Sequence, residues 1–166
     1  TEVFGLPAAT ISEAASATTI VLLAPDLKEE LPVLYLRLRD AAQKRRSRIL
    51  EFTAAKSGLS KYAWRTVETE PGTQAVTVRN TLADADVRAQ IAKGNVVVVV
   101  GRANLAESAD NTVAALSTLL AEIPGAKVLP VVRRGNVRGA VAAGINGGST
   151  TEIFKAAVSG KVDTLV

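Results

Sequence analysis

Short runs of β-branched and aliphatic residues alternate along the chain with longer segments in which apolar residues recur every three or four positions. The short runs predict strands, and the longer segments predict amphipathic helices. The clearest strand is "VVVVV" at residues 96–100, since an unbroken apolar run indicates a strand buried on both faces in a parallel sheet. The predicted strands cover residues 18–23, 49–52, 63–69, 96–100, 127–132 and 162–166.

Helices are predicted between these strands. Thr10 and Glu13 have the spacing of a capping box and predict a short helix before the first strand. Residues 24–48 place acids first, leucines at helical spacing next and bases last, which is the order that the helix dipole favours. Further helices are expected within residues 73–93 (one or two), 103–123 and 149–160.

Two long segments, residues 20–52 and 96–131, share the order strand, acidic loop, helix, strand. This order is that of a βαβ unit, whose strands lie parallel. We therefore predict the α/β class, with a doubly wound, mainly parallel, Rossmann-like sheet and helices on both faces. The length predicts one domain over residues 1–166, and a chain that starts at Thr and lacks Met is expected to be a fragment of a larger one.

The amino-acid composition limits the partners and the kinds of site that the chain can have. The 20 basic and 16 acidic residues leave a net charge of +4 that is spread along the chain, so nucleic acid is not an expected partner. The sequence has no Cys and no His, so it supplies no thiolate or imidazole for a metal, an iron–sulfur cluster or a catalytic serine. No apolar run reaches the roughly 20 residues of a membrane span. We predict no catalytic residue, no metal site and no insertion into a membrane.

Ligands of doubly wound folds bind at the carboxyl ends of the strands, which directs attention to residues 24–30, 101–108 and 133–139. In the first loop, Asp26 and its acidic neighbours stand at the positive end of a helix, where a phosphate would meet like charge. The second loop lacks the G-x-G-x-x-G pattern and has Glu107 near the next helix start, although Arg102 could hold an anion.

The third loop opens a stretch, residues 131–148, with three arginines and five glycines, and Asn136 in it is a candidate for left-handed backbone. Three interpretations stay open: solvated arginines on a closely packed loop, contact with another domain or subunit, and a small-molecule anion site. The basic run at residues 44–48 is either a helix C-terminus or a docking patch, and Trp64 is expected to pack in a core or interface. The candidate cofactor-binding residues are Arg102, Asn104, Arg133, Arg134, Asn136 and Arg138.

Several segments together resemble a known family. "NVVVVVGRANLAES", "KVLPVVRRGNVRGAVAAGINGG" and the closing "SGKVDTLV" are similar to the molybdopterin-oxidoreductase-type region of the G subunit of bacterial respiratory NADH:quinone oxidoreductase (complex I), in an actinobacterial form. The resemblance implies a middle domain, of the formate dehydrogenase and DMSO reductase type, within a large peripheral subunit. Iron–sulfur clusters are then expected in the parent chain outside this fragment. The expected partners are other domains of the same polypeptide and neighbouring complex I subunits, on the cytoplasmic face of the inner membrane.

Relatives that bind a molybdopterin guanine dinucleotide carry Gly or Asn after the first strand, where this chain has Ala24-Pro25-Asp26-Leu27. The resemblance therefore implies a structural and assembly role with no cofactor in this fragment. Two alternatives remain: a pterin-dinucleotide- or nucleotide-binding domain of a molybdopterin oxidoreductase, and a middle domain of a thiamine-diphosphate-type enzyme.

Overall fold

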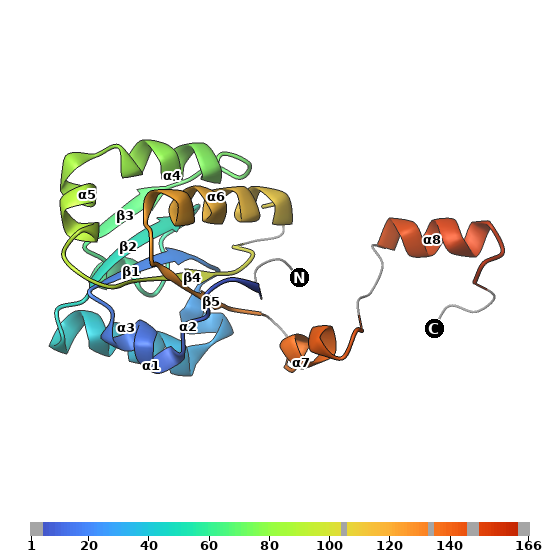
Figure 1. Cartoon of the computed structure of the whole chain (residues 1–166), viewed down its shortest axis with the longest axis horizontal. Coiled ribbons are helices and arrows are strands. Elements are labelled where there is room, and N and C mark those ends of the chain that lie inside the picture. The colour runs from blue at the N-terminus through green and yellow to red at the C-terminus, as the bar shows by residue number, and fades with distance from the viewer. Residues whose placement is uncertain (1–4, 104–105, 133–134, 146–149, 163–166) are drawn as a thin grey trace. The chain divides into compact units, whose positions relative to one another are not determined.

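The structure is a computed structural model that describes residues 5–103, 106–132, 135–145 and 150–162. The chain divides into two compact units, residues 1–133 and residues 134–166, which we describe separately (Figure 1). The expectation of one domain over residues 1–166 stays a prediction.

The first unit is built on a five-stranded sheet with the order β3-β2-β1-β4-β5, in which every neighbouring pair is parallel. Val21 in β1 is aligned with Leu50 in β2 on one side and with Val98 in β4 on the other. The chain therefore builds the sheet outward from β1 in both directions, which confirms the predicted doubly wound fold. The strands are β1 (Thr19–Leu23), β2 (Arg48–Thr53), β3 (Arg65–Glu68), β4 (Val96–Val100) and β5 (Lys127–Pro130).

Helices cover both faces of this sheet (Figure 1). One face carries α1 (Ile11–Ser16), α2 (Leu27–Glu30) and α3 (Pro32–Lys44), and the other carries α4 (Gln74–Leu82), α5 (Ala85–Ile91) and α6 (Ala109–Glu122). A short 3-10 helix, η2 (Ser60–Tyr62), precedes β3.

The valine run of β4 supplies both cores. Val96, Val98 and Val100 pack on the side of α4 and α6, whereas Val97 and Val99 pack on the side of α1 and α3. All five side chains are buried, which confirms the predicted central strand. Side chains alternate between the two faces of a strand, so only a continuous apolar run can fill both cores.

Local sequence signals explain the helix boundaries. The capping box is confirmed: the Glu13 N–H donates to the Thr10 hydroxyl at 3.1 Å, and the Thr10 N–H donates to the Glu13 carboxylate at 2.7 Å. The acidic segment before α3 is itself the one-turn helix α2, which ends at Glu30 with Leu31 as its C-cap. Pro32 has no N–H and disfavours helical backbone at the preceding residue, so Leu31 leaves the helical region (φ −142°, ψ 68°) and a new helix, α3, begins at Pro32.

The described residues of the second unit form two helices, α7 (Val137–Ala142) and α8 (Thr150–Val158). The latter confirms the helix predicted near residues 149–160. Ile153 and Phe154 are exposed on α8, in a part of the chain where the described residues bury no apolar side chain. The strand predicted at residues 162–166 lies almost entirely outside the described residues.

Candidate functional site

The strand order turns between β1 and β4, and the crevice at the carboxyl ends of these two strands is where doubly wound folds bind ligands. Around Gly101, at the end of β4, the chain packs closely against itself. The Gly101 N–H donates to the carbonyl oxygen of Leu23 at 2.8 Å, which joins the two strand ends. A Cβ at Gly101 would lie 2.6 Å from the Val131 side chain and 3.4 Å from the Pro25 ring. Pro25 and Val131 therefore leave no room beside Gly101, while a hollow of about 340 Å³ remains farther along this edge, between the end of β5 and the start of α3.

The Asp26 carboxylate accepts hydrogen bonds from the backbone N–H groups beside this crevice. Asp26 caps α2, and its Oδ1 accepts from the Lys28 N–H at 2.9 Å. Its two carboxylate oxygens also accept from the Gly58 N–H, at 3.2 and 3.1 Å. Backbone N–H groups that are free at the start of a helix can bind a phosphate. Here these N–H groups already donate to the negatively charged Asp26 carboxylate.

Hydrogen bonds of Glu107 and Arg102 hold the second candidate loop in place. Glu107 is 3% exposed, and its Oε2 accepts from the Gly72 N–H at 3.1 Å. Gly72 has a positive φ of 85°, which favours glycine at the turn before α4. Arg102 is exposed, and its Nε donates to the carbonyl oxygen of Glu107 at 2.9 Å, so this candidate residue orders its own loop.

A third carboxylate, Glu51 of β2, lies buried nearby and was not predicted as a functional or structural residue. Hydroxyl groups surround it: Ser57 donates to Oε1, while Ser60 and Thr66 donate to Oε2 at 2.7 and 3.0 Å. It is 3% exposed. The available signal was a glutamate inside the apolar strand "ILEF", because a buried charge needs hydrogen-bond partners.

The arginine-rich loop is described only in part. Arg133, Arg134 and the earlier candidate Asn104 lie outside the described residues. Asn136 has the predicted left-handed backbone, with φ 58° and ψ 20°, and begins α7. Arg138 is exposed and has no hydrogen-bond or ion-pair partner among the described residues. Its role in binding stays a prediction, as do those of the other candidates.

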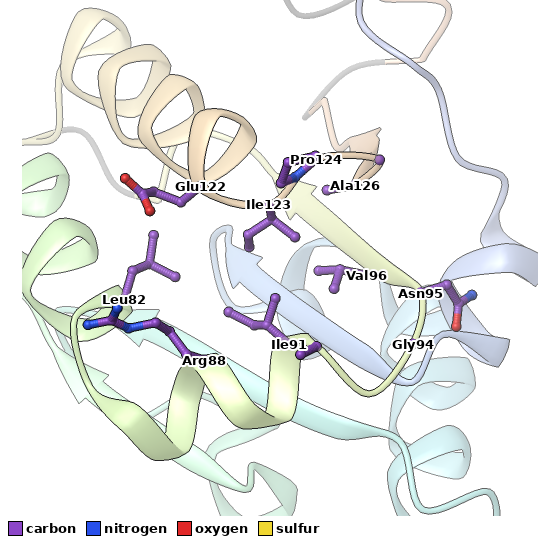
Figure 2. A pocket seen from close by; sticks show the side chains of 12 residues that line it. Leu82, Arg88, Ile91, Gly94, Asn95, Val96, Glu122, Ile123, Pro124 and Ala126 are labelled. Atoms are coloured by element: carbon purple, nitrogen blue, oxygen red, sulfur yellow. The ribbon is translucent and has the colours of Figure 1, made fainter.

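The opposite, amino edge of the sheet also carries a cavity. A cavity of about 530 Å³ lies between α5 and the end of α6, and Figure 2 shows Leu82, Ile91 and Ile123 pointing into it. Two charged side chains, Arg88 and Glu122, stand among its lining residues. The Arg88 guanidinium donates to the Ala83 carbonyl oxygen at 2.7 Å, so this cavity offers no pair of groups suited to general acid–base catalysis.

Neither a metal centre nor a membrane span is found in the part of the chain that the structure describes. Within those ranges, no group of three or more His, Cys, Asp or Glu side chains is placed to hold a metal ion. In the same ranges, no helix combines the length and apolar character that crossing a membrane requires.

Comparison with known proteins gives a partial match. No protein-family model matches the chain. Over 132 residues it is 35% identical to the G subunit of NADH-quinone oxidoreductase from Mycobacterium bovis and to the protein of the same name from Mycobacterium tuberculosis. The match covers 78% of this chain and 16% of each relative, so the chain corresponds to a small part of those proteins. The similarity supports a domain related to a complex I component.

Proposed function

We propose that this chain is a structural and assembly domain of a protein like the G subunit of NADH-quinone oxidoreductase. The observation that carries the proposal is the tight packing of Pro25 and Val131 around Gly101, at the strand end where a dinucleotide would approach. Asp26 supports it, since its carboxylate binds amides that a phosphate would otherwise use. The 35% identity to the mycobacterial G subunits supports the choice of parent protein.

In this proposal the fragment binds no cofactor, and electrons pass from NADH to quinone through iron–sulfur clusters held elsewhere in the parent chain. The sequence contains no cysteine or histidine, the side chains that ligate such clusters. The domain packs against other domains of the same polypeptide and against neighbouring subunits. Its proposed location is the cytoplasmic face of the inner membrane, as a peripheral part of the complex.

The alternative is a nucleotide- or pterin-dinucleotide-binding domain, and the β3-β2-β1-β4-β5 order of the sheet is the observation in its favour. Isothermal titration calorimetry of the chain with GDP and with a molybdopterin analogue separates the two. We expect no saturable heat with either compound. Micromolar binding that Arg102→Ala abolishes would support the alternative and overturn the structural proposal.

A second experiment tests the assembly role in the full-length parent protein. Val98 is fully buried in β4, so Val98→Asp places an unpaired charge in the core and unfolds the domain. We expect loss of the assembled complex on native gels together with its NADH:quinone activity. Glu68→Gln, at an exposed position of β3, is the control and should leave both unchanged. Normal assembly with the Val98→Asp variant would contradict the proposal.

A further inference from the structure

The amino edge of the sheet carries a group of positive charges: Arg45, Arg46, Arg48 and Lys93, which we call the basic amino edge. Two hollows, of about 370 and 320 Å³, meet there and share Arg46, Ser47 and Arg48 in their walls. Arg45 and Lys93 join the second hollow. No aspartate or glutamate lines either one. Both hollows therefore present positive charge to whatever enters them.

The positive charge of the basic amino edge is larger than the negative partial charge of the helix C-termini beside it. The C-terminus of α3 and that of α5 each carry about half a negative charge from the helix dipole. Lys44 at the end of α3 is paired with Asp40 at 2.7 Å. The three exposed arginines have no ion pair or side-chain hydrogen bond among the described residues, and the Lys93 Nζ donates to the Gln90 amide oxygen at 3.2 Å. Arg45 also interacts electrostatically with the Asp40 carboxylate, so the charge without a counterpart among the described residues lies mainly on Arg46 and Arg48.

The backbone of Arg46 adopts a conformation that is unfavourable for arginine. Its φ is 61°, in the left-handed region that glycine or asparagine adopts after a helix at lower cost. The Ser47 N–H donates to the Ala41 carbonyl oxygen at 3.2 Å and so completes the turn at the end of α3. A glycine would make the same turn without strain, yet the chain places there the guanidinium that both hollows share.

Aromatic side chains in the first hollow indicate whether an acidic protein segment or a nucleic acid fits the basic amino edge. Tyr62 and Trp64 line the first hollow beside the arginines, and Trp, Tyr and Arg are the residues that dominate protein–protein interfaces. The Lys61 ammonium lies 5.0 Å from the centre of the Tyr62 ring, and the Arg65 guanidinium lies 5.8 Å from that of Trp64. Trp64 also packs against the core. A cation of the chain thus lies over one face of each ring, where a nucleic-acid base would otherwise stack.

We propose that the basic amino edge docks an acidic segment of a partner protein. Its carboxylates accept hydrogen bonds from the guanidinium groups in the two hollows, because the planar guanidinium matches a carboxylate with two parallel bonds. An apolar side chain of the same segment packs against Tyr62 and Trp64. The inference goes beyond the proposed function and does not depend on it, since it stands on the unpaired charge, the strained arginine and the shared hollows.

The test measures binding of a fluorescent peptide of alternating glutamate and leucine by anisotropy at moderate salt. The triple variant Arg45→Glu, Arg46→Glu, Arg48→Glu should bind at least roughly tenfold more weakly than the wild type. The matched control reverses three exposed basic residues away from both hollows, Arg37, Lys56 and Arg79. It changes net charge equally and should bind within about twofold of the wild type, because specific contacts rather than total charge set the affinity.

Three results would overturn the inference: an equal loss of affinity in the control, equal binding of a glutamine and leucine peptide, or tighter binding of single-stranded DNA than of the acidic peptide. Circular dichroism and thermal unfolding verify the fold of each variant. Should the triple variant not fold, Arg46→Gly combined with Arg48→Gln removes the shared guanidinium groups without adding charge. Binding by that double variant should fall at least about threefold, and unchanged binding would contradict the proposal.

Discussion

Gly101→Ala tests the closed crevice on which the proposed function rests. The added methyl group would meet the Val131 Cγ2 at 2.6 Å and the Val131 carbonyl oxygen at 2.8 Å. The carbonyl belongs to the backbone at the end of β5, and the Val131 N–H donates to the carbonyl oxygen of Val100 at 2.8 Å. The backbone at Val131 therefore cannot withdraw without disturbing the junction of β4 and β5.

The expected cost follows from two opposing effects. Forcing a methyl group into a packed site costs about 1–3 kcal/mol. Replacing glycine by alanine also reduces the entropy of the unfolded chain, which returns about 0.4–1 kcal/mol. Together the two effects leave a net loss of about 0–2.6 kcal/mol in the free energy of unfolding, and we expect a value near the middle, about 1.3 kcal/mol. Combining it with Val131→Ala should recover part of this loss, because the Cγ2 contact disappears while the contact with the carbonyl oxygen remains.

Urea unfolding monitored by the fluorescence of Trp64, the single tryptophan, measures these changes. Trp64 packs against the core of the sheet, so its emission reports unfolding of the first unit. Gly5→Ala is the control, because no atom lies within 4 Å of a Cβ built at Gly5. If Gly101→Ala were as stable as that control, the crevice would have room for a ligand and the reasoning would be refuted.

Three further predictions use the same unfolding assay. Arg46→Gly should raise the free energy of unfolding by about 0.5–1 kcal/mol, because it relieves the positive φ; unchanged or lower stability would contradict the strain. Glu51→Gln should cost about 1–3 kcal/mol, since the amide offers one acceptor oxygen to three hydroxyl donors, whereas the exposed Glu68→Gln should have little effect. The Lys127 ammonium, 2.5 Å away, and hydrogen bonds with Thr10 lower the pKa of Glu13 from 4.5 to about 2. The Glu13 contribution is therefore present above pH 4.5 and lost as the pH falls toward 2, so the stability gap to Glu13→Gln should close over that range; a constant gap would exclude this ion pair.

Some features of the candidate site could be predicted from the sequence and others could not. The acids at the start of the first loop were expected to repel a phosphate, and the structure adds that Asp26 also binds the Gly58 N–H from a different loop. Nothing local indicates that pairing, because it depends on where the loop after β2 passes. The left-handed backbone of Asn136 was predictable, since asparagine tolerates that conformation better than most residues.

The sequence by itself determined the elements and the fold class, as the valine run of β4 and the capping box of α1 illustrate. Such signals depend on residues a few positions apart. They can be recognised in the sequence because side chains recur on one face every two residues in a strand and about every 3.6 residues in a helix. Only the tertiary structure decided that Val131 fills the crevice at Gly101, and that Lys93 joins the arginines that follow α3. These neighbours come from segments far apart in the chain, and the order of strands in the sheet brings them together.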